Sequence, residues 1–318
     1  MFKKTLLRLV KLLLGLVVLS IAWYGVHRLA ASSTALNSFE IPTISQVEPK
    51  GDSLRVGAYN IAHGRGGKLG ESNWTSKTRK LGEAHLLKIA KQIRAENLDV
   101  VVLNEVDFDA SWSGGHNQAR FIAENAGYRF VSTLTNIDID FPFFDLKFGN
   151  AILSRIPLKD ISLIELPPVK PWEPILAGKK NGMIATVGFS DKALRFVAIH
   201  IETRSYETRM GSAAKILEHI QKTNVPSVLL GDFNSQRSDA GSTVVDALLD
   251  QHGFKTDVDF KSWKTFPSEA PDRGIDWILV DSELSIRNSQ AVPSALSDHL
   301  MVTAEIFPLS REPTRSAN

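Results

Sequence analysis

Four short motifs in the second half of the chain carry the side chains that could do chemistry. In each, an apolar run adjoins carboxylate, amide or imidazole groups, which is how a β-sheet presents polar side chains at one edge. The motifs are Ala198-Ile199-His200, Gly231-Asp232-Phe233-Asn234, Ile275-Asp276-Trp277 and Ser297-Asp298-His299. Together they indicate the active-site edge of a hydrolase that cleaves phosphoesters with a divalent metal ion.

Gly231-Asp232-Phe233-Asn234 is the sharpest of these motifs. Apolar residues 228–230 lead into it, and Gly231 permits a close approach of the backbone. Alternation along an extended chain places Asp232 and Asn234 on one side and packs Phe233 away. An Asx-type turn would use the same residue types, so the motif alone leaves a structural and a catalytic interpretation open.

Two histidines stand next to other apolar runs. His200 closes one of them, where a lone histidine is more often a structural residue, but residues 202–205 after it are rich in donors that suit a phosphate-facing loop. Asp276 is embedded in a second run. We predict that Asp276 holds the ring of His299 in one tautomer and stabilises its charged form.

An amide and a carboxylate end two apolar runs in the first half of the chain. Asn60 ends one of them, and Glu105 follows the run 100–103. A carboxylate in that position needs a cation, which a salt bridge or a metal ion could supply. Because Mg²⁺ needs few carboxylates and keeps water and substrate oxygens as its other ligands, Glu105 is a candidate metal ligand.

Composition limits the alternatives. With 318 residues, of which 43% are hydrophobic, and no internal repeat, the chain can bury one large core, so one catalytic domain is expected. The chain contains no cysteine, which excludes disulfides, thiolate metal sites and cysteine nucleophiles. Any metal must therefore be held by oxygen or imidazole.

The net charge of +2 is unevenly distributed. Residues 1–35 hold five of the 37 basic residues and no acid, which leaves 32 basic and 35 acidic residues, or −3, in the rest of the chain. Proteins that coat DNA without sequence preference usually have a basic body. The slightly acidic body therefore weakens a broad nuclease role.

The amino terminus resembles an export or anchor segment. Residues 12–26 carry no charge, four basic residues precede them, and Trp23 and Tyr24 stand near their far end. We predict that residues 1–31 form an uncleaved single-pass anchor, and the positive-inside rule then places the body outside the cytoplasm. A cleaved signal and secretion, or a buried soluble helix, are the alternatives.

The remaining chain divides into a linker, 32–52, a catalytic domain, 53–309, and a tail, 310–318. Apolar residues at helical spacing predict amphipathic helices at 86–93 and 210–217. These features favour a four-layer α/β sandwich of two packed mixed β-sheets flanked by helices, with a hydrophobic helix at the amino terminus. Strands are predicted at 54–60, 99–105, 150–154, 183–189, 194–201, 227–231, 275–280 and 301–307.

The ordered set of motifs resembles the endonuclease/exonuclease/phosphatase superfamily over about residues 53–307. Each motif is short, but their combination in this order is specific. Three departures are mild: Asn104 stands where glutamine often precedes the metal glutamate, and Phe148 and Trp277 lack hydroxyls that are common there. The resemblance is carried by Asn60, Glu105, Gly149-Asn150-Ala151-Ile152-Leu153-Ser154, His200, Gly231-Asp232-Phe233-Asn234, Ile275-Asp276-Trp277 and Ser297-Asp298-His299.

The resemblance implies a metal site and a water-activating group. Glu105, with Asn60 and Asp298, would hold a divalent ion, Mg²⁺ or alternatively Mn²⁺. Asp232 would orient and deprotonate the attacking water.

It also implies residues that contact the phosphate. Asn234 and His200 would donate hydrogen bonds to it, and His299, held by Asp276, would help the leaving side. Further candidate phosphate contacts are Asn150, Arg204 and Arg209.

Substrate class is left open by the sequence. Residues 137–148 contain four phenylalanines, which could pack into the core or contact lipid or substrate. Lys179 and Lys180 are predicted to form a solvated turn, with recognition of a second phosphate as the alternative. The leading hypothesis is a membrane-anchored phosphodiesterase or phosphatase that acts on a phospholipid head group, a small phosphoester or a nucleic acid, with no protein partner. A secreted or tethered nuclease and a non-enzymatic phosphate-binding module are the alternatives.

Overall fold

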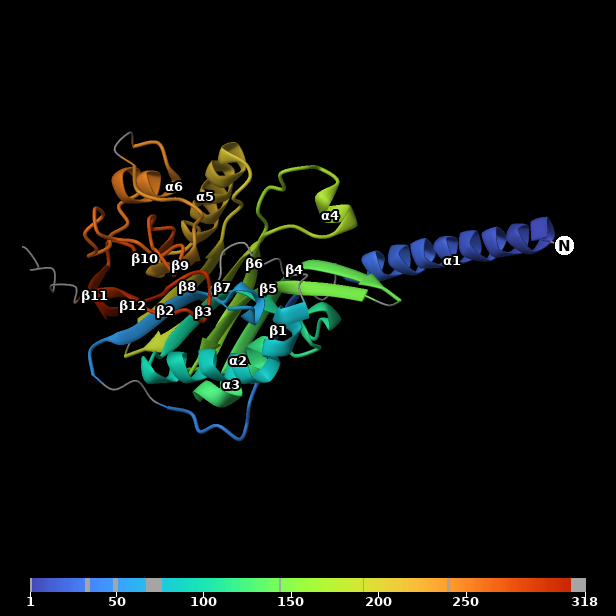
Figure 1. The fold of residues 1–318 in the computed structure, drawn as a ribbon. Helices are drawn as coiled ribbons and strands as arrows, with labels where there is room; N and C mark the ends of the chain where they lie inside the picture. The colour runs from blue at the N-terminus through green and yellow to red at the C-terminus, as the bar shows by residue number, and fades with distance from the viewer. Residues whose placement is uncertain are drawn as a thin grey trace, which may run out of the picture.

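The computed structural model describes residues 2–31, 35–47, 51–66, 76–142, 144–190, 192–238 and 241–309, with the side chains of residues 2 and 76–81 left out. Within these residues, two mixed β-sheets pack face to face between helices (Figure 1). The predicted four-layer α/β sandwich is confirmed.

The first sheet has seven strands, and its one parallel pair among the described strands is β2 with β3. The bounds, in spatial order, are β1 (Leu36–Glu40), β4 (Phe130–Phe141), β5 (Phe144–Ser154), β3 (Val100–Asp107), β2 (Leu54–Asn60), β12 (Met301–Pro308) and β11 (Leu284–Val292).

The second sheet has five strands, in which β8 and β9 are parallel. Carboxyl ends of parallel neighbours meet at one edge of a sheet, so each sheet gathers polar strand ends from its parallel pair. The bounds, in spatial order, are β10 (Asp276–Val280), β9 (Ser227–Asp232), β8 (Lys192–His200), β7 (Gly182–Phe189) and β6 (Leu158–Ile164).

Three apolar clusters hold the layers together. One lies between the sheets and includes Val56, Val102 and Phe196, all fully buried. A second packs the seven-stranded sheet against the helices α2 and α3, and a third packs the five-stranded sheet against α5 and α6. The helical segments of the body are η1 (Ala62–Gly64), α2 (Ser76–Ala95), η2 (Ser111–Ser113), α3 (Gln118–Ala126), α4 (Glu173–Leu176), α5 (Tyr206–Ile220), α6 (Val244–Asp246) and the π-helical η3 (Ala247–Gln251).

The region expected to be a linker, 32–52, contains a strand. Residues Leu36–Glu40 pair antiparallel with Phe130–Leu134 of β4 and form one edge of the seven-stranded sheet. Ile41 is buried in the cluster beneath α2 and α3. The expectation of a polar linker was therefore wrong for this stretch, because five residues with backbone partners suffice to extend a sheet.

The phenylalanine-rich segment 137–148 extends β4 and β5 into a long hairpin. Its alternating Ile and Asp residues follow the period of a strand. Phe141, near the tip, is 37% exposed and stacks on Tyr24 at a ring-centroid distance of 4.5 Å. The tip therefore meets the amino-terminal helix rather than the core.

The amino-terminal helix α1 (Phe2–Ala31) projects away from the body (Figure 1). Among the described residues, the segment Lys3–Ala30 is long and apolar enough to cross a membrane, a test that a signal sequence also passes. Its carboxyl end meets the body through polar contacts. Arg28 donates hydrogen bonds to the main-chain oxygens of Asp138, Pro174 and Ile175, at 2.8 to 3.0 Å.

Candidate active site

The polar strand ends of the two sheets face one another. Asn60 pairs in register with Asn104 on the parallel strands β2 and β3, and His200 pairs with Asp232 on β8 and β9. The Asn104 side-chain oxygen accepts a hydrogen bond of 2.9 Å from the Asp232 amide, which joins the two sheets at this edge. The sequence motifs from both halves of the chain thus share one site.

Asn60 links the two carboxylates of the site. Its Nδ2 donates to Glu105 Oε1 at 3.3 Å and to Asp232 Oδ2 at 3.1 Å. Its Oδ1 accepts from the Ala62 amide at 3.0 Å. The amide therefore sits between the group predicted to bind the metal and the group predicted to activate water.

Glu105 is turned into the site by an irregularity in β3. The register with β5 shifts between Asn104 and Val106, and Glu105 has φ of 53°, which a β-bulge explains. Its side chain is 25% exposed, whereas that of Asp232 is 2% exposed. Glu105 is thus the more accessible carboxylate.

His63 and Asp107, which the motifs did not single out, surround Glu105. His63 Nε2 lies 3.3 Å from Glu105 Oε2, and its Nδ1 lies 2.9 Å from Asp107 Oδ1. Asp107 stands two residues after Glu105 on β3, and His63 stands three residues after Asn60. Their closeness in sequence to two predicted metal ligands was the signal that could have found them.

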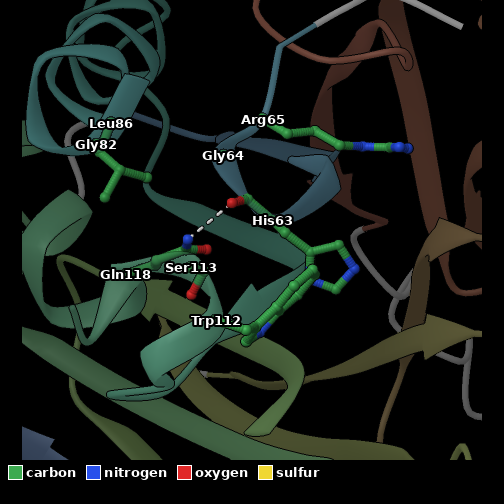
Figure 2. A pocket seen from close by; sticks show the side chains of 8 residues that line it. All are labelled: His63, Gly64, Arg65, Gly82, Leu86, Trp112, Ser113 and Gln118. Carbon is green, nitrogen blue, oxygen red and sulfur yellow. Dashed lines mark hydrogen bonds between the residues drawn. The ribbon is translucent and has the colours of Figure 1, made fainter. Parts of the chain in front are cut away.

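Aromatic and amide groups fix the His63 ring. Figure 2 shows Trp112 against the ring and the Gln118 side chain bonded to the His63 carbonyl, a contact of 2.8 Å. Trp112 and Phe148 each lie edge-on to the imidazole at a centroid distance of 4.8 Å. Phe148, at a position where the family often has a hydroxyl, therefore packs on His63 here.

Charges around Glu105 keep it ionised. Burial opposes ionisation, but the hydrogen bond and charge of His63 hold the pKa of Glu105 well below its usual range. Burial likewise lowers the pKa of His63, yet Asp107 and Glu105 together raise it to about 10. The pair is therefore a carboxylate beside an imidazolium.

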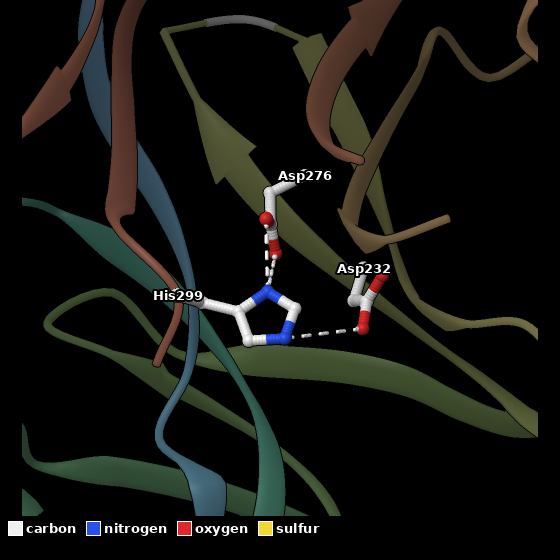
Figure 3. A group of neighbouring side chains, drawn as sticks. All are labelled: Asp232, Asp276 and His299. Carbon is white, nitrogen blue, oxygen red and sulfur yellow. Dashed lines mark hydrogen bonds and ion pairs between the residues drawn. The ribbon is translucent and has the colours of Figure 1, made fainter. Parts of the chain in front are cut away.

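Asp232, Asp276 and His299 form a second cluster (Figure 3). Asp276 places its two oxygens 3.0 and 3.1 Å from His299 Nδ1, and Thr265 donates to Asp276 at 2.6 Å. His299 Nε2 points at Asp232 Oδ2, 3.9 Å away. One ligand atom from each of the three buried residues lies within 4.8 Å of the others, a spacing that would suit a metal ion only if His299 gave up its proton.

The environment of Asp232 has the opposite effect from that of Glu105. Burial raises the pKa of Asp232 to about 6, with His299 and Lys180 acting against that rise and Asp276 adding to it. Burial lowers the pKa of His299, but the charge and hydrogen bond of Asp276 raise it to about 10. Asp232 is thus close to the range in which a carboxylate accepts a proton near neutral pH.

Lys180 is half-buried and directed into the site, so the predicted solvated turn is wrong for this residue. Its Nζ lies 2.6 Å from His200 Nε2 and donates to the Ile201 carbonyl at 3.0 Å. Burial and the charge of Lys180 hold the pKa of His200 well below its ordinary value. An ammonium has only donors, so the neutral ring accepts at Nε2, and Lys180 brings the positive charge that His200 does not carry.

Asn234 and Asp298 lie at the rim of the same site. Asn234 has φ of 45°, and its amide N–H and side chain donate to the two oxygens of Asp232 at 2.8 and 3.2 Å. Asp298 Oδ2 accepts from Arg65 at 2.7 Å. Arg65 thus neutralises Asp298, whose role as a metal ligand stays a prediction.

The three predicted phosphate contacts have partners in the protein. Asn150 accepts from Asn104 at 2.9 Å in the buried network behind the site. Arg204 forms ion pairs with Glu202 and Glu173, at 2.8 and 2.9 Å. Arg209 donates to the Thr203 carbonyl at 2.7 Å, and a phosphate-binding role for all three stays a prediction.

The donor set fits a hard divalent cation. Glu105 offers an ionised, partly exposed carboxylate. Asn60 turns its Nδ2 toward Glu105, and its Oδ1 accepts from the Ala62 amide, so a role for Asn60 as an oxygen ligand stays a prediction. Mg²⁺ and Mn²⁺ prefer oxygen ligands, and a site with one carboxylate and access to solvent leaves positions for water and a phosphate oxygen.

Comparison with known proteins agrees with this geometry. The sequence profile of the Endonuclease/Exonuclease/phosphatase family matches residues 57–299. The chain belongs to this family. The matched region spans the site from β2 to His299, and phosphoester hydrolysis, mostly with a divalent metal, is the chemistry of its members. Comparison with curated proteins finds no significant match.

Several solved structures share the fold. One from Beutenbergia cavernae is 23% identical, with a TM-score of 0.62, over 81% of this chain and 72% of the other. The human Nocturnin catalytic domain with bound sulfate is 16% identical, with a TM-score of 0.56, over 86% and 97%. A mannosyl-6-phosphatase from Bacteroides thetaiotaomicron is 14% identical, with a TM-score of 0.56, over 80% and 99%.

Proposed function

We propose that this protein is a divalent-metal-dependent phosphodiesterase or phosphatase that stays anchored in a membrane by α1, with its active site outside the cytoplasm. The observation that carries the chemistry is the pair of carboxylates joined by Asn60. Glu105 is held ionised, whereas the pKa of Asp232 is raised to about 6. When the surroundings of two carboxyl groups shift their pKa values in opposite directions, the two groups can take different roles in catalysis.

Each acid has a distinct task in the proposed reaction. Glu105 and Asn60 hold the ion, with Asp298 at the rim, and Mg²⁺ or Mn²⁺ supplies charge neutralisation at a phosphate oxygen when it is bound. Asp232 orients the attacking water and accepts its proton. The two hydrogen bonds from Asn234 keep the Asp232 carboxylate in one orientation.

Two positive groups act on the proposed general base. Lys180 and the imidazolium of His299 both exert their charge on Asp232 and would stabilise the charge that develops as the P–O bond breaks. Asp276 holds His299 protonated, so Nε2 can donate to the phosphate or the leaving oxygen.

The contacts of α1 with the body support a retained anchor. Arg28 binds three main-chain oxygens, and His27 lies 2.9 Å from Asp138. These bonds join the helix to β4 and α4, and removal of α1 by cleavage would break them all. Basic residues before the apolar run orient the anchor with the body outside the cytoplasm.

The experiment is a turnover assay of the detergent-solubilised full chain with a synthetic phosphodiester and a synthetic phosphomonoester. Activity should appear with Mg²⁺ or Mn²⁺, disappear with chelator, and be lost in Asp232→Asn. The exposed Asp272→Asn variant is the matched control and should keep activity. Unchanged turnover in Asp232→Asn at an unchanged thermal midpoint would overturn the assignment.

A further inference from the structure

The end of α1 fixes where a bilayer would meet the body. Figure 1 shows the tip of the β4–β5 hairpin and α4 gathered at the base of the helix. Arg28 bonds the carbonyls of α4 and β4, and Tyr24 stacks on Phe141 at the tip. A helix of 30 residues is about 45 Å long, enough to cross the ~30 Å hydrocarbon layer with the body close to the surface.

Large apolar side chains lie exposed around that base. Ile175 is 69% exposed, Leu176 50%, Trp172 54% and Phe141 37%. We call these four residues the apolar rim. They lie next to the carboxyl-terminal part of α1, where Tyr24 stacks on Phe141 and Arg28 bonds the carbonyl of Pro174, and Trp23 of α1 is itself exposed. Such an apolar rim is costly in water and suits the boundary between head groups and acyl chains.

A groove joins the apolar rim to the active site. It encloses about 390 Å³, and its lining includes Pro168, Val169 and Trp172 near α4 and Lys180 and His200 at the catalytic end. Gly178 crosses Asn136 so closely in this lining that a Cβ would lie 2.1 Å from its carbonyl oxygen, so residue 178 has to be glycine. The volume is in the range of pockets that hold small ligands.

We propose that this groove admits a membrane phospholipid, which the bilayer around α1 presents to the catalytic site across the apolar rim. This inference rests on the proposed function and names its substrate class. The phosphate would reach Lys180 and His299, while the glyceride part passes Trp172 toward the acyl layer. The apolar rim opposes a nucleic acid at this entrance, because it offers the phosphate backbone no cation.

The reaction remains hydrolysis of one P–O bond. The water oxygen bonds to phosphorus, its proton passes to Asp232, and the leaving alcohol oxygen takes the bond electrons and a proton. A lipid phosphodiester therefore yields one alcohol and one phosphomonoester, with no oxidant or reductant involved.

The first test measures turnover by the full chain in nanodiscs. Phospholipid of the disc and a soluble synthetic phosphodiester are assayed with Mg²⁺, for the wild type and for the Ile175→Ser/Leu176→Ser variant. We expect lipid turnover to fall at least about tenfold in the variant, while turnover of the soluble diester stays within about twofold. Leu309→Ser, an exposed apolar residue after β12, is the matched control and should leave both rates unchanged.

The outcomes separate the two proposals. Hydrolysis of the soluble diester or of an oligonucleotide, without hydrolysis of disc lipid, would overturn the phospholipid inference and leave the proposed function standing. An equal loss on lipid and soluble diester in the rim variant would also overturn it. Failure to hydrolyse any phosphoester would contradict the proposed function itself.

The second test measures the position of the rim without activity. Because the chain has no cysteine, Ile175→Cys and Leu309→Cys can each be labelled with a fluorophore at one site. In nanodiscs that contain brominated lipid, we expect quenching of the label at residue 175 and not at residue 309. If the label at residue 175 is not quenched, or is quenched no more than the label at residue 309, the rim does not face the bilayer and the phospholipid inference is wrong.

Discussion

Two histidine–aspartate pairs flank the site, and they serve carboxylates of opposite character. In the seven-stranded sheet, Asp107 holds His63 against Glu105. At the five-stranded sheet, Asp276 holds His299 toward Asp232. Both histidines have their pKa raised to about 10, so each pair presents an imidazolium to an acid.

The difference between the pairs lies in distance and exposure. His63 Nε2 is 3.3 Å from a quarter-exposed Glu105, whereas His299 Nε2 is 3.9 Å from a buried Asp232. The first acid therefore stays ionised, and the second has its pKa raised by burial to about 6. A histidine–aspartate pair thus stands beside an acid that stays ionised, Glu105, and beside one that can accept a proton, Asp232.

The largest effect that tests the difference between the two acids is expected for Asp232→Asn. We expect kcat to fall about 10³-fold or more, because the amide cannot take the proton from water. Affinity for Mn²⁺, measured by calorimetry on the same protein, should change by no more than about threefold. A large loss of metal affinity with retained kcat would reverse the roles of the two acids.

Glu105→Gln should show the complementary effect. The Mg²⁺ concentration for half-maximal activity is expected to rise about 100-fold, since the ionised ligand of the site is lost. Turnover at saturating metal should recover more fully than in Asp232→Asn. A metal titration that matches the wild type would exclude Glu105 as a ligand.

The two supporting aspartates test the pairs directly. Asp276→Asn should lower kcat about 100-fold at saturating Mg²⁺, because His299 loses the charge that keeps it protonated. Asp107→Asn should instead raise the half-activating Mg²⁺ concentration about tenfold, because it acts through His63 and Glu105. The comparison fails if both variants change the same kinetic constant.

A smaller effect is expected on stability in the presence of chelator. A histidine whose pKa rises from 6.5 to about 10 on folding contributes stability that is complete below pH 6.5 and is lost as pH rises through 10. The free energy of unfolding should therefore fall between pH 6.5 and 9, by about 1 kcal/mol per pH unit for each histidine. His63→Gln should flatten that slope in denaturant titrations of the full chain, and parallel slopes would contradict the raised pKa.

The sequence predicted what neighbouring residues decide. The bounds of β2 matched the apolar run, and Asp276 and His299 are in contact as expected because each stands beside a strand in its own motif. His63 was missed although it stands close to Asn60 in sequence. Its protonation and its orientation toward Glu105 depend on Asp107, which is 44 residues away. Lys180 was misplaced because a lysine next to another lysine is usually solvated, and only the fold brings His200 against it.

The hairpin shows the same limit. The alternation of Ile137, Asp138, Ile139 and Asp140 is the period of a strand, yet the cluster of phenylalanines drew attention to core packing or to a loop. Its tip finds its neighbour in α1, more than a hundred residues earlier in the chain. Local pattern predicts such a strand, whereas its partner follows only from tertiary structure.

The early strand β1 limits the length of chain that connects α1 to the body. It is pinned to β4 from Leu36 onward, and α1 ends at Ala31, so the five intervening steps span at most about 18 Å. With α1 in a bilayer, the body could not travel farther than that from its anchor even if the contacts of Arg28 opened. Encounters between the active site and a membrane substrate would then occur by lateral diffusion in two dimensions. The rate of hydrolysis would depend on the number of substrate molecules per unit of membrane area rather than on their concentration in bulk.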